Sequence, residues 1–507
     1  MGDLPWTRRR LFGFPEKAMR THAVIFGSTG SGKTETELRI AYGARKVYHR
    51  QVIYLDAKGE TRREDERQED NAARFVATMH AAGARSVYVF PALHYNGWQG
   101  TPQELKNRLL AVVDYSESPF YGDVAANALD LALSAPTTPR SSSHFLANLR
   151  YDRLKAIYKD DPQKLQRVLS LDKHLLQQVE MRYQVFFSAV GGQLDGKLDY
   201  VDADAVYLRV RGFTLHNEAP RLGRFFVMDF IHYLAERRRP GIKTLFIIDE
   251  FNALRMREET SILFEQARSF GGNLIISAQG YAGLGPHEYA ERILDACPTH
   301  VLHARSDPGP IARRAGKKLF LDVSWSEDEE GIPRKHIRPK WDWRISETAV
   351  MQQEEGQAFW SYRGHSQHVQ TAQVPITSAQ IAEAWREIHH QEEIQRQLLE
   401  VEAHRRAEQQ AKVEPQNGSA ATGGRTGASG AATPPPGGSK PHGSKSSVST
   451  PKQSQQNSKH EQPKAKASSS SQSPGRSKPV RQPSPPVTPP APAPPAPDPD
   501  DDEPDRL

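Results

Sequence analysis

The sequence predicts an α/β fold: a mostly parallel sheet with helices on both faces, an inserted all-α segment and a disordered C-terminal tail. Three observations predict this fold. Short runs rich in β-branched residues alternate with helical patterns along most of the chain, as in parallel sheets wrapped by helices. One central stretch is helical throughout. The end of the chain is rich in Pro, Ser and Gly and cannot bury a core.

Seven short apolar runs are expected to form the strands of the sheet. They are Ala23–Phe26, Val52–Leu55, Ser86–Phe90, Ala205–Leu208, Thr244–Ile248, Asn273–Ser277 and His300–His303. Runs of this length without regular alternation are typical of strands that are buried on both faces. We expect residues 1–97 and 201–375 to be the two parts of one domain built on these strands.

Residues 98–200 are expected to form an all-α insertion in that domain. The sequence Thr101-Pro102-Gln103-Glu104 has the pattern of a capping box with proline at the first helical position. Helical patterns follow it at 123–133, 145–158 and 171–190. An insertion of helices into one α/β domain is the simplest account of this order.

The insertion has a basic segment whose role the sequence leaves open. Nine Lys or Arg residues lie between Arg140 and Arg182, against five Asp or Glu residues. Tyr151, Tyr158 and Tyr183 lie among them. Basic and aromatic residues together could hold DNA by charge and stacking, or they could form a solvated helical face with half-buried tyrosines.

After the sheet-forming part, residues 376–413 are expected to form an amphipathic helix from about Ser378 to Lys412. Apolar residues recur there at a spacing of three to four. The heptad pattern is broken, so one face should pack on the body rather than form a coiled coil. Residues 414–507 are expected to be disordered, either as a flexible tether or as a tail whose acidic end docks a basic partner.

The bulk composition excludes some classes of protein. The 507-residue chain has one cysteine, Cys297, so an intramolecular disulfide or a cysteine-based metal cage is excluded. No apolar stretch reaches about 18 residues, and we therefore expect a cytoplasmic protein without a transmembrane segment of its own. The net charge is +6, and most of it belongs to the tail. A nucleic-acid surface on the folded part must therefore be a local patch.

Residues Gly27–Thr34 match the pattern G-x-x-x-x-G-K-[ST] of a phosphate-binding loop. An apolar run precedes them and a helical pattern follows, so backbone N–H groups and the positive helix end would converge on phosphates. Lys33 should reach the β and γ phosphates, and the Thr34 hydroxyl should bind Mg²⁺. The sequence thus predicts a RecA-like P-loop NTPase with ATP and Mg²⁺ as cofactors. The predicted nucleotide-binding residues are Gly27, Ser28, Thr29, Gly30, Ser31, Gly32, Lys33 and Thr34.

Asp249 and Glu250 end another apolar run. A parallel strand delivers its last residues to the carboxyl edge of the sheet, where nucleotides bind. Asp249 is expected to hold the metal through its water shell. Glu250 is expected to act as the general base that takes a proton from the attacking water. An acidic pair after a strand is a weak signal alone, but together with the phosphate loop it predicts ATP hydrolysis.

Four segments in this order carry a resemblance to a known family: His22–Thr34, Leu55–Glu60, Phe246–Leu254 and Gln266–Gln279. They resemble the conjugative coupling proteins of type IV secretion, of the TraG and TraD type, within the ring-forming DNA translocases that include the FtsK and HerA motors. The phosphate loop marks only the superfamily. The Asp-x-Lys-Gly-acid step at 56–60 and the Arg-Ser-x-Gly helix end at 268–271 point to the coupling proteins.

The resemblance implies two further site residues. Arg268 would reach the γ-phosphate held by a neighbouring subunit, and Gln279 would sense the γ-phosphate or the attacking water. The resemblance also implies a homo-hexameric ring with DNA in its pore and the helical insertion at the side where DNA enters. From the residues alone, Gln279 should lie near the nucleotide because its strand neighbours that of Asp249. The alternative for Arg268, near a helix end, is a favourable interaction with the helix dipole.

Other residues near these motifs stay open in their roles. The charged residues of Asp56–Glu60 either form a salt-bridged turn or contact nucleotide or DNA. Arg305, after the last predicted strand, is either a second phosphate sensor or a surface arginine. His300 and His303 lack an acidic or cysteine partner at ligand spacing, so no metal site is expected there.

The predicted function is an ATP-driven DNA translocase that resembles a coupling protein delivering DNA to a type IV secretion channel, with DNA, a relaxase and channel components as partners. Coupling proteins typically begin with membrane-spanning helices, whereas this phosphate loop begins at residue 27 after the basic cluster Arg8–Arg10. Peripheral attachment at the inner face of the membrane would need partners or that cluster. Two alternatives stay open: a HerA-like or FtsK-like motor for DNA processing or defence, and an adaptor that uses ATP only as a switch.

Overall fold

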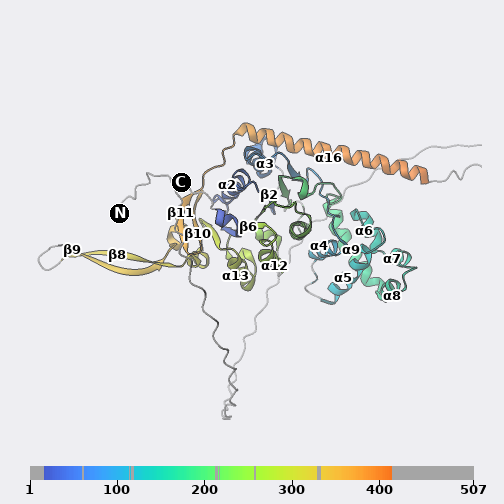
Figure 1. Cartoon of the computed structure of the whole chain (residues 1–507), viewed down its shortest axis with the longest axis horizontal. Helices are drawn as coiled ribbons and strands as arrows, with labels where there is room; N and C mark the ends of the chain where they lie inside the picture. The colour runs from blue at the N-terminus through green and yellow to red at the C-terminus, as the bar shows by residue number, and fades with distance from the viewer. Residues whose placement is uncertain are drawn as a thin grey trace, which may run out of the picture. The chain divides into compact units, whose positions relative to one another are not determined.

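The computed structural model describes most of the first 413 residues of the chain. The described residues are 16–59, 62–113, 115, 119–211, 215, 217–255, 259–327 and 333–413. The predicted disordered tail, the basic cluster Arg8–Arg10 and Glu60 therefore lie outside the described residues. Figure 1 shows the arrangement of the described elements.

The core element is a nine-stranded sheet in the order β11-β10-β7-β1-β6-β5-β2-β4-β3. The seven strands from β7 to β3 pair in parallel, and β10 and β11 add an antiparallel hairpin at the β7 side. The bounds are β1 Ala23–Phe26, β2 Gln51–Asp56, β3 Val87–Phe90, β4 Ala205–Arg209, β5 Thr244–Asp249, β6 Gly272–Ala278, β7 Thr299–His303, β10 Gln357–Tyr362 and β11 His365–Gln370. The predicted α/β fold is confirmed, and the seven predicted runs are its seven parallel strands.

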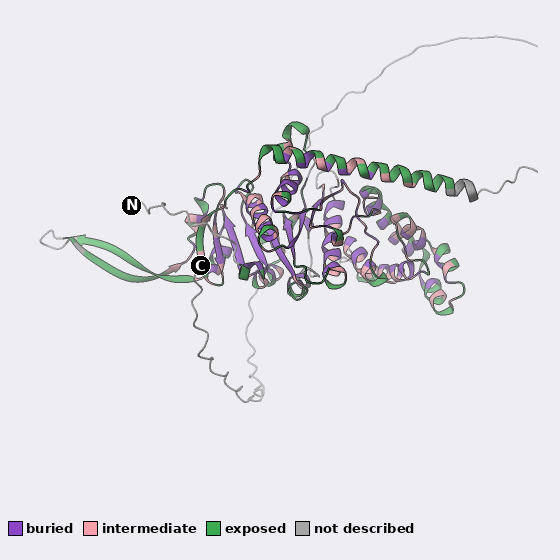
Figure 2. Cartoon of the chain, turned by 45° about the horizontal axis from the view of Figure 1, so that its top comes forward, coloured by how far each residue is buried: buried purple, intermediate pink, exposed green. Residues whose placement is uncertain are grey.

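Two apolar cores lie on the two faces of this sheet. Successive residues of β1 alternate between them: Val24 and Phe26 belong to one core, and Ala23 and Ile25 to the other. This alternation is the normal geometry of a strand. Both faces of the seven parallel strands are covered, which explains why these strands are buried along most of their length (Figure 2) and why their sequences read as continuous apolar runs.

Helices supply the other half of each core. On one face lie α1, α2, α3 and the start of α16, and on the other lie α11, α12, α13 and the inserted helices. Their bounds are α1 Glu16–Met19, α2 Lys33–Lys46, α3 Asn71–Ala81, α11 Glu218–His232, α12 Glu259–Gln266, α13 His287–Ala296, α14 Gly309–Ala312, α15 Glu347–Met351 and α16 Ser378–Val413. Short turns are η1 Glu64–Glu69, η2 Tyr200–Asp202, η3 Tyr233–Arg237, η4 Phe251–Leu254, η5 Tyr281–Leu284 and η6 Arg313–Ala315.

Six helices lie between β3 and β4, in the stretch expected to be all α. They are α4 Pro102–Val112, α5 Pro119–Leu133, α6 Ser142–Leu149, α7 Tyr151–Ile157, α8 Pro162–Ser170 and α9 Lys173–Val190. The capping box forms as expected, because Glu104 N donates to Thr101 Oγ1 at 3.3 Å and Thr101 N donates to the Glu104 carboxylate at 2.6 Å. A buried ion pair between Arg108 of α4 and Asp229 of α11, at 2.6 Å, ties the insertion to the body.

The tyrosines of the basic segment serve the core of the insertion. Tyr183 is fully buried and donates to Leu109 O at 3.0 Å. Tyr158 is also buried and donates to Leu131 O at 2.7 Å. Neither ring is available for stacking on a base, so a DNA surface using these two tyrosines is excluded. Tyr151 is half-buried, with the Lys173 ammonium 5.6 Å from its ring centre.

The amphipathic helix α16 lies along α3 (Figure 1) and also contacts β3, the last strand of the sheet. Its buried apolar residues pack in the α2–α3 core. The side-chain amide of Gln391 accepts from Val89 N at 3.0 Å and donates to Val87 O at 2.9 Å, and Gln395 accepts from His94 N at 2.9 Å. These amides take the place of a tenth strand and satisfy backbone groups that an edge strand would otherwise leave unpaired.

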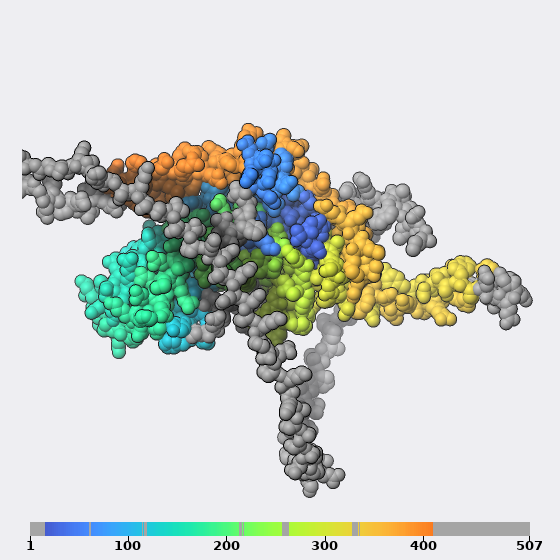
Figure 3. All heavy atoms as spheres, turned by 180° about the vertical axis from the view of Figure 1, so that it is seen from behind, coloured from blue at the N-terminus to red at the C-terminus, as the bar shows by residue number. Residues whose placement is uncertain are grey.

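A second, two-stranded sheet is formed by β8 Lys317–Glu327 and β9 Pro333–Trp343. Neither this hairpin nor β10 and β11 were among the predicted strands. Side chains on a strand alternate between its faces, and one face of the hairpin is apolar. The residues of that face are Leu319, Leu321, Val323, Trp325, Ile337 and Trp341, which are between 45% and 67% exposed. In Figure 3 the hairpin (yellow) stands clear of the other described elements.

Candidate functional site: a nucleotide-binding edge of the sheet

The predicted phosphate loop connects β1 to α2 at the carboxyl edge of the sheet. Gly32 has φ of +95°, which is accessible to glycine without strain. At Gly27, a Cβ atom would come within 2.7 Å of His303 Cβ, so a side chain does not fit. Gly32 precedes α2 without a side-chain cap, and the first N–H groups of the helix are therefore left for a ligand.

The amine of Lys33 is folded back on the loop. Lys33 Nζ donates to Gly27 O at 2.9 Å and to Ser28 O at 3.1 Å, and the residue is only 7% exposed. Within the described part of the chain, the hydrogen bonds of this buried ammonium go to neutral carbonyl oxygens, so it would gain from an anion in the loop. The eight predicted loop residues thus lie together and form a cradle suited to phosphates.

Asp249 ends β5, two strands away from the loop, with β6 between them. Ser277 of β6 donates to Asp249 Oδ1 at 2.7 Å, and Glu250 N donates to Ser277 Oγ at 3.1 Å. Burial, assisted by the negative charges of Asp56 and Glu250, raises the pKa of Asp249 to about 6. A buried carboxylate among other acids would gain from a nearby cation, and hard oxygen donors are what Mg²⁺ prefers.

A further acid, Glu37 of α2, lies next to Asp249. The hydroxyl of Tyr54 in β2 donates to Glu37 Oε2 and approaches Asp249 Oδ2 at 3.4 Å. Burial raises the pKa of Glu37 well above its usual range. Sequence reasoning missed Glu37, although its position four residues after Lys33 places both side chains on the same side of the helix.

The carboxylate of Glu250 is held from two sides. Gln279 Nε2 donates to Glu250 Oε1 at 3.1 Å, and Lys58 Nζ lies 3.2 Å from Oε2. Glu250 itself has φ of +53°, an uncommon conformation for a residue other than glycine. The structure thus brings the predicted Glu250 and Gln279 together and adds Lys58, which sequence reasoning left open.

Arg268 is not part of this edge of the sheet. It lies in the turn before β6, so it sits at the amino end of a strand whose carboxyl end carries Gln279. Its side chain is exposed. Because β6 runs parallel to β1, Arg268 lies at the amino ends of the parallel strands and the phosphate loop lies at their carboxyl ends. The chain cannot bring this arginine to its own nucleotide.

His300 and His303 are structural. His303 Nε2 is 3.0 Å from Thr36 Oγ1, and Nδ1 is 2.9 Å from Gln357 O. Burial lowers the pKa of His303, and likewise that of His300, to about 4, so both are neutral at pH 7. Among the described residues, no group of three or more His, Cys, Asp or Glu side chains forms a metal cage.

The described part of the chain has no helix with the length and apolarity that crossing a membrane requires. No protein-family model matches the chain. In sequence, a segment of 47 residues is 55% identical to the type 4 coupling protein DotL of Legionella pneumophila; it spans 9% of this chain and 6% of DotL.

Solved structures of TrwB have a similar fold. Unbound TrwBdeltaN70, a bacterial conjugative coupling protein, matches with a TM-score of 0.54 and 13% identity over 72% of this chain and 86% of that chain. The plasmid coupling protein TrwB in complex with ADP and Mg²⁺ matches with a TM-score of 0.52 and 13% identity over 73% of this chain and 89% of that one. The chain is therefore similar to the conjugative coupling proteins, in fold over most of its described length and in sequence over one short segment, and the resemblance carried by its motifs is confirmed.

Proposed function

We propose that this protein is a Mg²⁺-dependent ATPase that moves DNA as a coupling protein of a type IV secretion system. The observation that carries this proposal is the meeting of Lys33, Asp249, Glu250 and Gln279 at the ends of three neighbouring strands. These residues can bind a triphosphate, hold a metal and activate a water. A structural glycine turn would need neither the buried acid nor the held glutamate.

Each residue has a distinct role in the proposed hydrolysis. Lys33 and the N–H groups of Gly27–Thr34 bind and orient the phosphates. Thr34 and Asp249 would hold Mg²⁺, which neutralises charge on the phosphates when bound. Glu250 takes a proton from the attacking water, while Gln279 and Lys58 orient its carboxylate. The complex of TrwB with ADP and Mg²⁺ supports the same ligands here.

We further propose that the active form is a homo-hexameric ring around DNA. Arg268 precedes β6, at the amino ends of the parallel strands, whereas the phosphate loop lies at their carboxyl ends. A contact of Arg268 with the γ-phosphate would therefore have to come from a neighbouring subunit. Head-to-tail contacts of this kind generate closed rings. Residues 1–97 and 201–375 would form the motor domain, and 98–200 the inserted domain where DNA enters.

The proposed partners follow from the same similarity. A coupling protein would connect a DNA-bound relaxase to components of the secretion channel. The protein would then act in the cytoplasm, peripherally at the inner face of the membrane through those partners.

The test is ATP turnover of the full chain with and without DNA, combined with mass measurement of the assembly. We expect turnover to be low for the monomer and to rise when DNA promotes ring formation. Turnover that does not respond to DNA at any protein concentration would contradict the translocase proposal. If a nuclease co-purified with the protein, and no relaxase or channel component did, the result would favour the alternative of a HerA-like or FtsK-like motor for DNA processing.

A further inference from the structure

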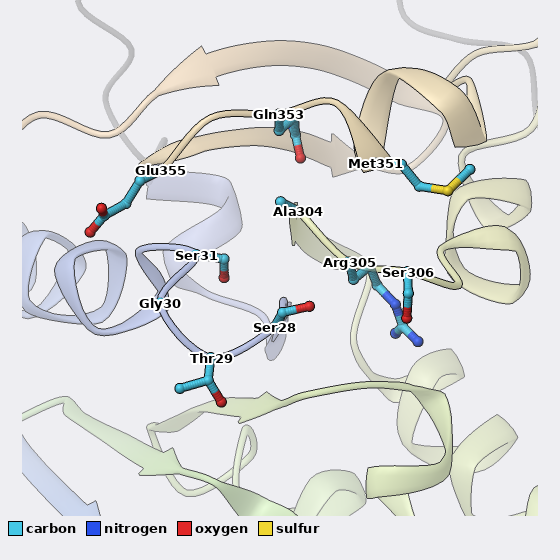
Figure 4. Close-up of a pocket in the computed structure, with 10 residues that line it drawn as sticks. All are labelled: Ser28, Thr29, Gly30, Ser31, Ala304, Arg305, Ser306, Met351, Gln353 and Glu355. Carbon is cyan, nitrogen blue, oxygen red and sulfur yellow. The ribbon is translucent and has the colours of Figure 1, made fainter.

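A cavity of about 450 Å³ adjoins the phosphate loop. Three segments line it: the loop itself, the turn after β7 at Ala304–Ser306, and the end of α15 at Met351 with Gln353 and Glu355 after it (Figure 4). Its volume is in the range of small-molecule sites. The cavity therefore offers space for more of a ligand than its phosphates.

Gln353 is a buried amide without a partner in this cavity. The residue is 9% exposed, and neither the nitrogen nor the oxygen of its side-chain amide forms a hydrogen bond within the described chain. In Figure 4 the amide points into the cavity, towards Ala304 and Ser31. Burying an amide without hydrogen bonds is unfavourable. The position of Gln353 thus calls for a polar group of a ligand.

Arg305 is a second unsatisfied group in the lining. Two of its nitrogens, Nε and Nη1, are buried without a hydrogen-bond partner among the described residues. Its Nη2 lies 2.7 Å from the position that a Cβ atom would take on Gly280. Gly280 directly follows Gln279, so the guanidinium reaches over the phosphate loop from β7 towards the β6 end. Burial lowers the pKa of Arg305, and the charge of nearby Asp307 offsets this only in part. A partly buried guanidinium with two nitrogens left without a hydrogen bond is suited to bind an anion.

We propose that this cavity receives the nucleoside of the bound nucleotide, with the Gln353 amide hydrogen-bonded to it, and that Arg305 contacts the phosphates of the same molecule. This inference rests on the proposed ATP site in the loop Gly27–Thr34. The loop determines where the phosphates bind, and the nucleoside extends from them into the adjoining space. Met351, which is 49% exposed, supplies an apolar wall for the base.

The two residues face different parts of one ligand. In Figure 4 the guanidinium of Arg305 points away from Gln353. Arg305 is directed to the side of the loop where Gln279 and Glu250 lie, which is where the terminal phosphates must be for hydrolysis. Gln353 lies at the opposite side. A ligand without a nucleoside should therefore depend on Arg305 but not on Gln353.

Inorganic tripolyphosphate provides that ligand. Calorimetric titration of the full chain with ATP and with tripolyphosphate, both with Mg²⁺, separates the two roles. We expect Gln353→Met to weaken ATP binding about three- to tenfold, the effect of losing a neutral hydrogen bond, and to leave tripolyphosphate binding unchanged. We expect Arg305→Met to weaken binding of both ligands about ten- to a hundredfold, because a hydrogen bond to a charged group is lost.

Matched substitutions on the surface serve as controls. Gln367→Met and Arg292→Met change exposed residues of β11 and α13 and should alter neither affinity. Thermal unfolding without ligand checks that each variant folds. Arg305→Met should be about as stable as the wild type, since two nitrogens of the guanidinium are buried without a hydrogen bond; if it nevertheless fails to fold, Arg305→Lys should give a smaller loss of affinity for both ligands.

The outcomes distinguish this inference from the proposed function. Equal effects of Gln353→Met on ATP and tripolyphosphate, or none on either, would overturn the nucleoside assignment. Unchanged affinities in Arg305→Met would overturn the phosphate contact. Lys33→Ala should abolish binding of both ligands; if it binds ATP as the wild type does, the phosphate loop is not the ATP site, and the proposed function fails with it.

Discussion

At the scale of single residues, the backbone of Glu250 is the most constrained feature of the site. Its φ of +53° costs about 1–3 kcal/mol for a residue other than glycine. The Glu250 N–H donates to Ser277 Oγ, while Gln279 and Lys58 contact the Glu250 carboxylate. These contacts fix both ends of the residue, so the acid is aimed before any ligand binds.

Replacement of this acid tests its role as general base. Glu250→Gln keeps the shape of the side chain but cannot accept a proton, so we expect ATP turnover to fall about 10²- to 10⁴-fold while ATP affinity stays within about threefold. Steady-state turnover and calorimetric titration measure the two quantities. Glu265→Gln, at an exposed position of α12, is the matched control. If Glu250→Gln turned over ATP as fast as the wild type, another residue would have to be the general base.

The raised pKa of Asp249 has a consequence for stability. Its value of about 6 in the folded state lies above the unfolded value of about 4. Between these values the folded protein keeps a proton that the unfolded chain has lost. The free energy of unfolding of the nucleotide-free protein therefore falls as pH rises from about 4 to 6.

Asp249→Asn removes this titration. We expect the variant to be more stable than the wild type at pH 7.5, by up to about 3 kcal/mol, and the gain to be smaller at pH 5. Urea unfolding at the two pH values measures the difference. Asp123→Asn, at an exposed position of α5, should change stability at neither pH. A gain of equal size at both pH values would show that the carboxyl of Asp249 does not titrate in this window.

At the scale of elements, α16 contributes to stability through hydrogen bonds as well as apolar contacts. Gln391→Leu would leave Val89 N–H and Val87 C=O without partners next to a buried side chain. We expect a loss of about 2–4 kcal/mol in the free energy of unfolding, because an unsatisfied buried polar group is costly. Chemical denaturation measures it.

Gln397→Leu is the control, since Gln397 lies on an exposed part of the same helix. Its effect should stay within about 0.5 kcal/mol. A loss of equal size in both variants would show that the effect of Gln391→Leu comes from the helix itself and not from the lost hydrogen bonds to β3.

The elements also show how far a sequence can predict this structure. The seven parallel strands were predictable because burial on both faces makes them continuous apolar runs. The hairpin β8–β9 and the strands β10 and β11 were missed, because they are not continuous apolar runs; in β11 every residue except Val369 is polar. In the candidate site, contiguous motifs revealed Lys33 and Asp249. Its spacing from Lys33 put Glu37 on the same side of the helix, but the approach of Glu37 to Asp249 was not predictable, because only the fold brings these two acids together.

At the scale of the whole molecule, Arg268 lies at the sheet edge opposite the nucleotide. Two inactive variants should therefore complement each other. Arg268→Ala keeps Glu250, the proposed general base, but lacks the proposed arginine. Glu250→Gln keeps Arg268 but lacks the proposed base. In a random mixture, about a quarter of head-to-tail interfaces combine an intact site with an intact arginine. We expect the mixture to regain up to about that share of wild-type turnover.

The measurement is DNA-stimulated turnover of each variant alone and of the two mixed in equal amounts. Arg292→Ala, at an exposed position of α13, should be active alone. A mixture that stays as inactive as its components would show that Arg268 does not act across a subunit interface.

The hydrogen bonds from α16 to the backbone of β3 have one more consequence. The two edges of the large sheet are not equivalent: β3 is closed by side-chain amides from α16, whereas β11 pairs on one side only. A chain shortened to end before Ser378 would bare the backbone of β3 and the apolar surface beneath the helix. Such a fragment should tend to aggregate by adding strands from its own copies, even though every residue of the nucleotide site would still be present.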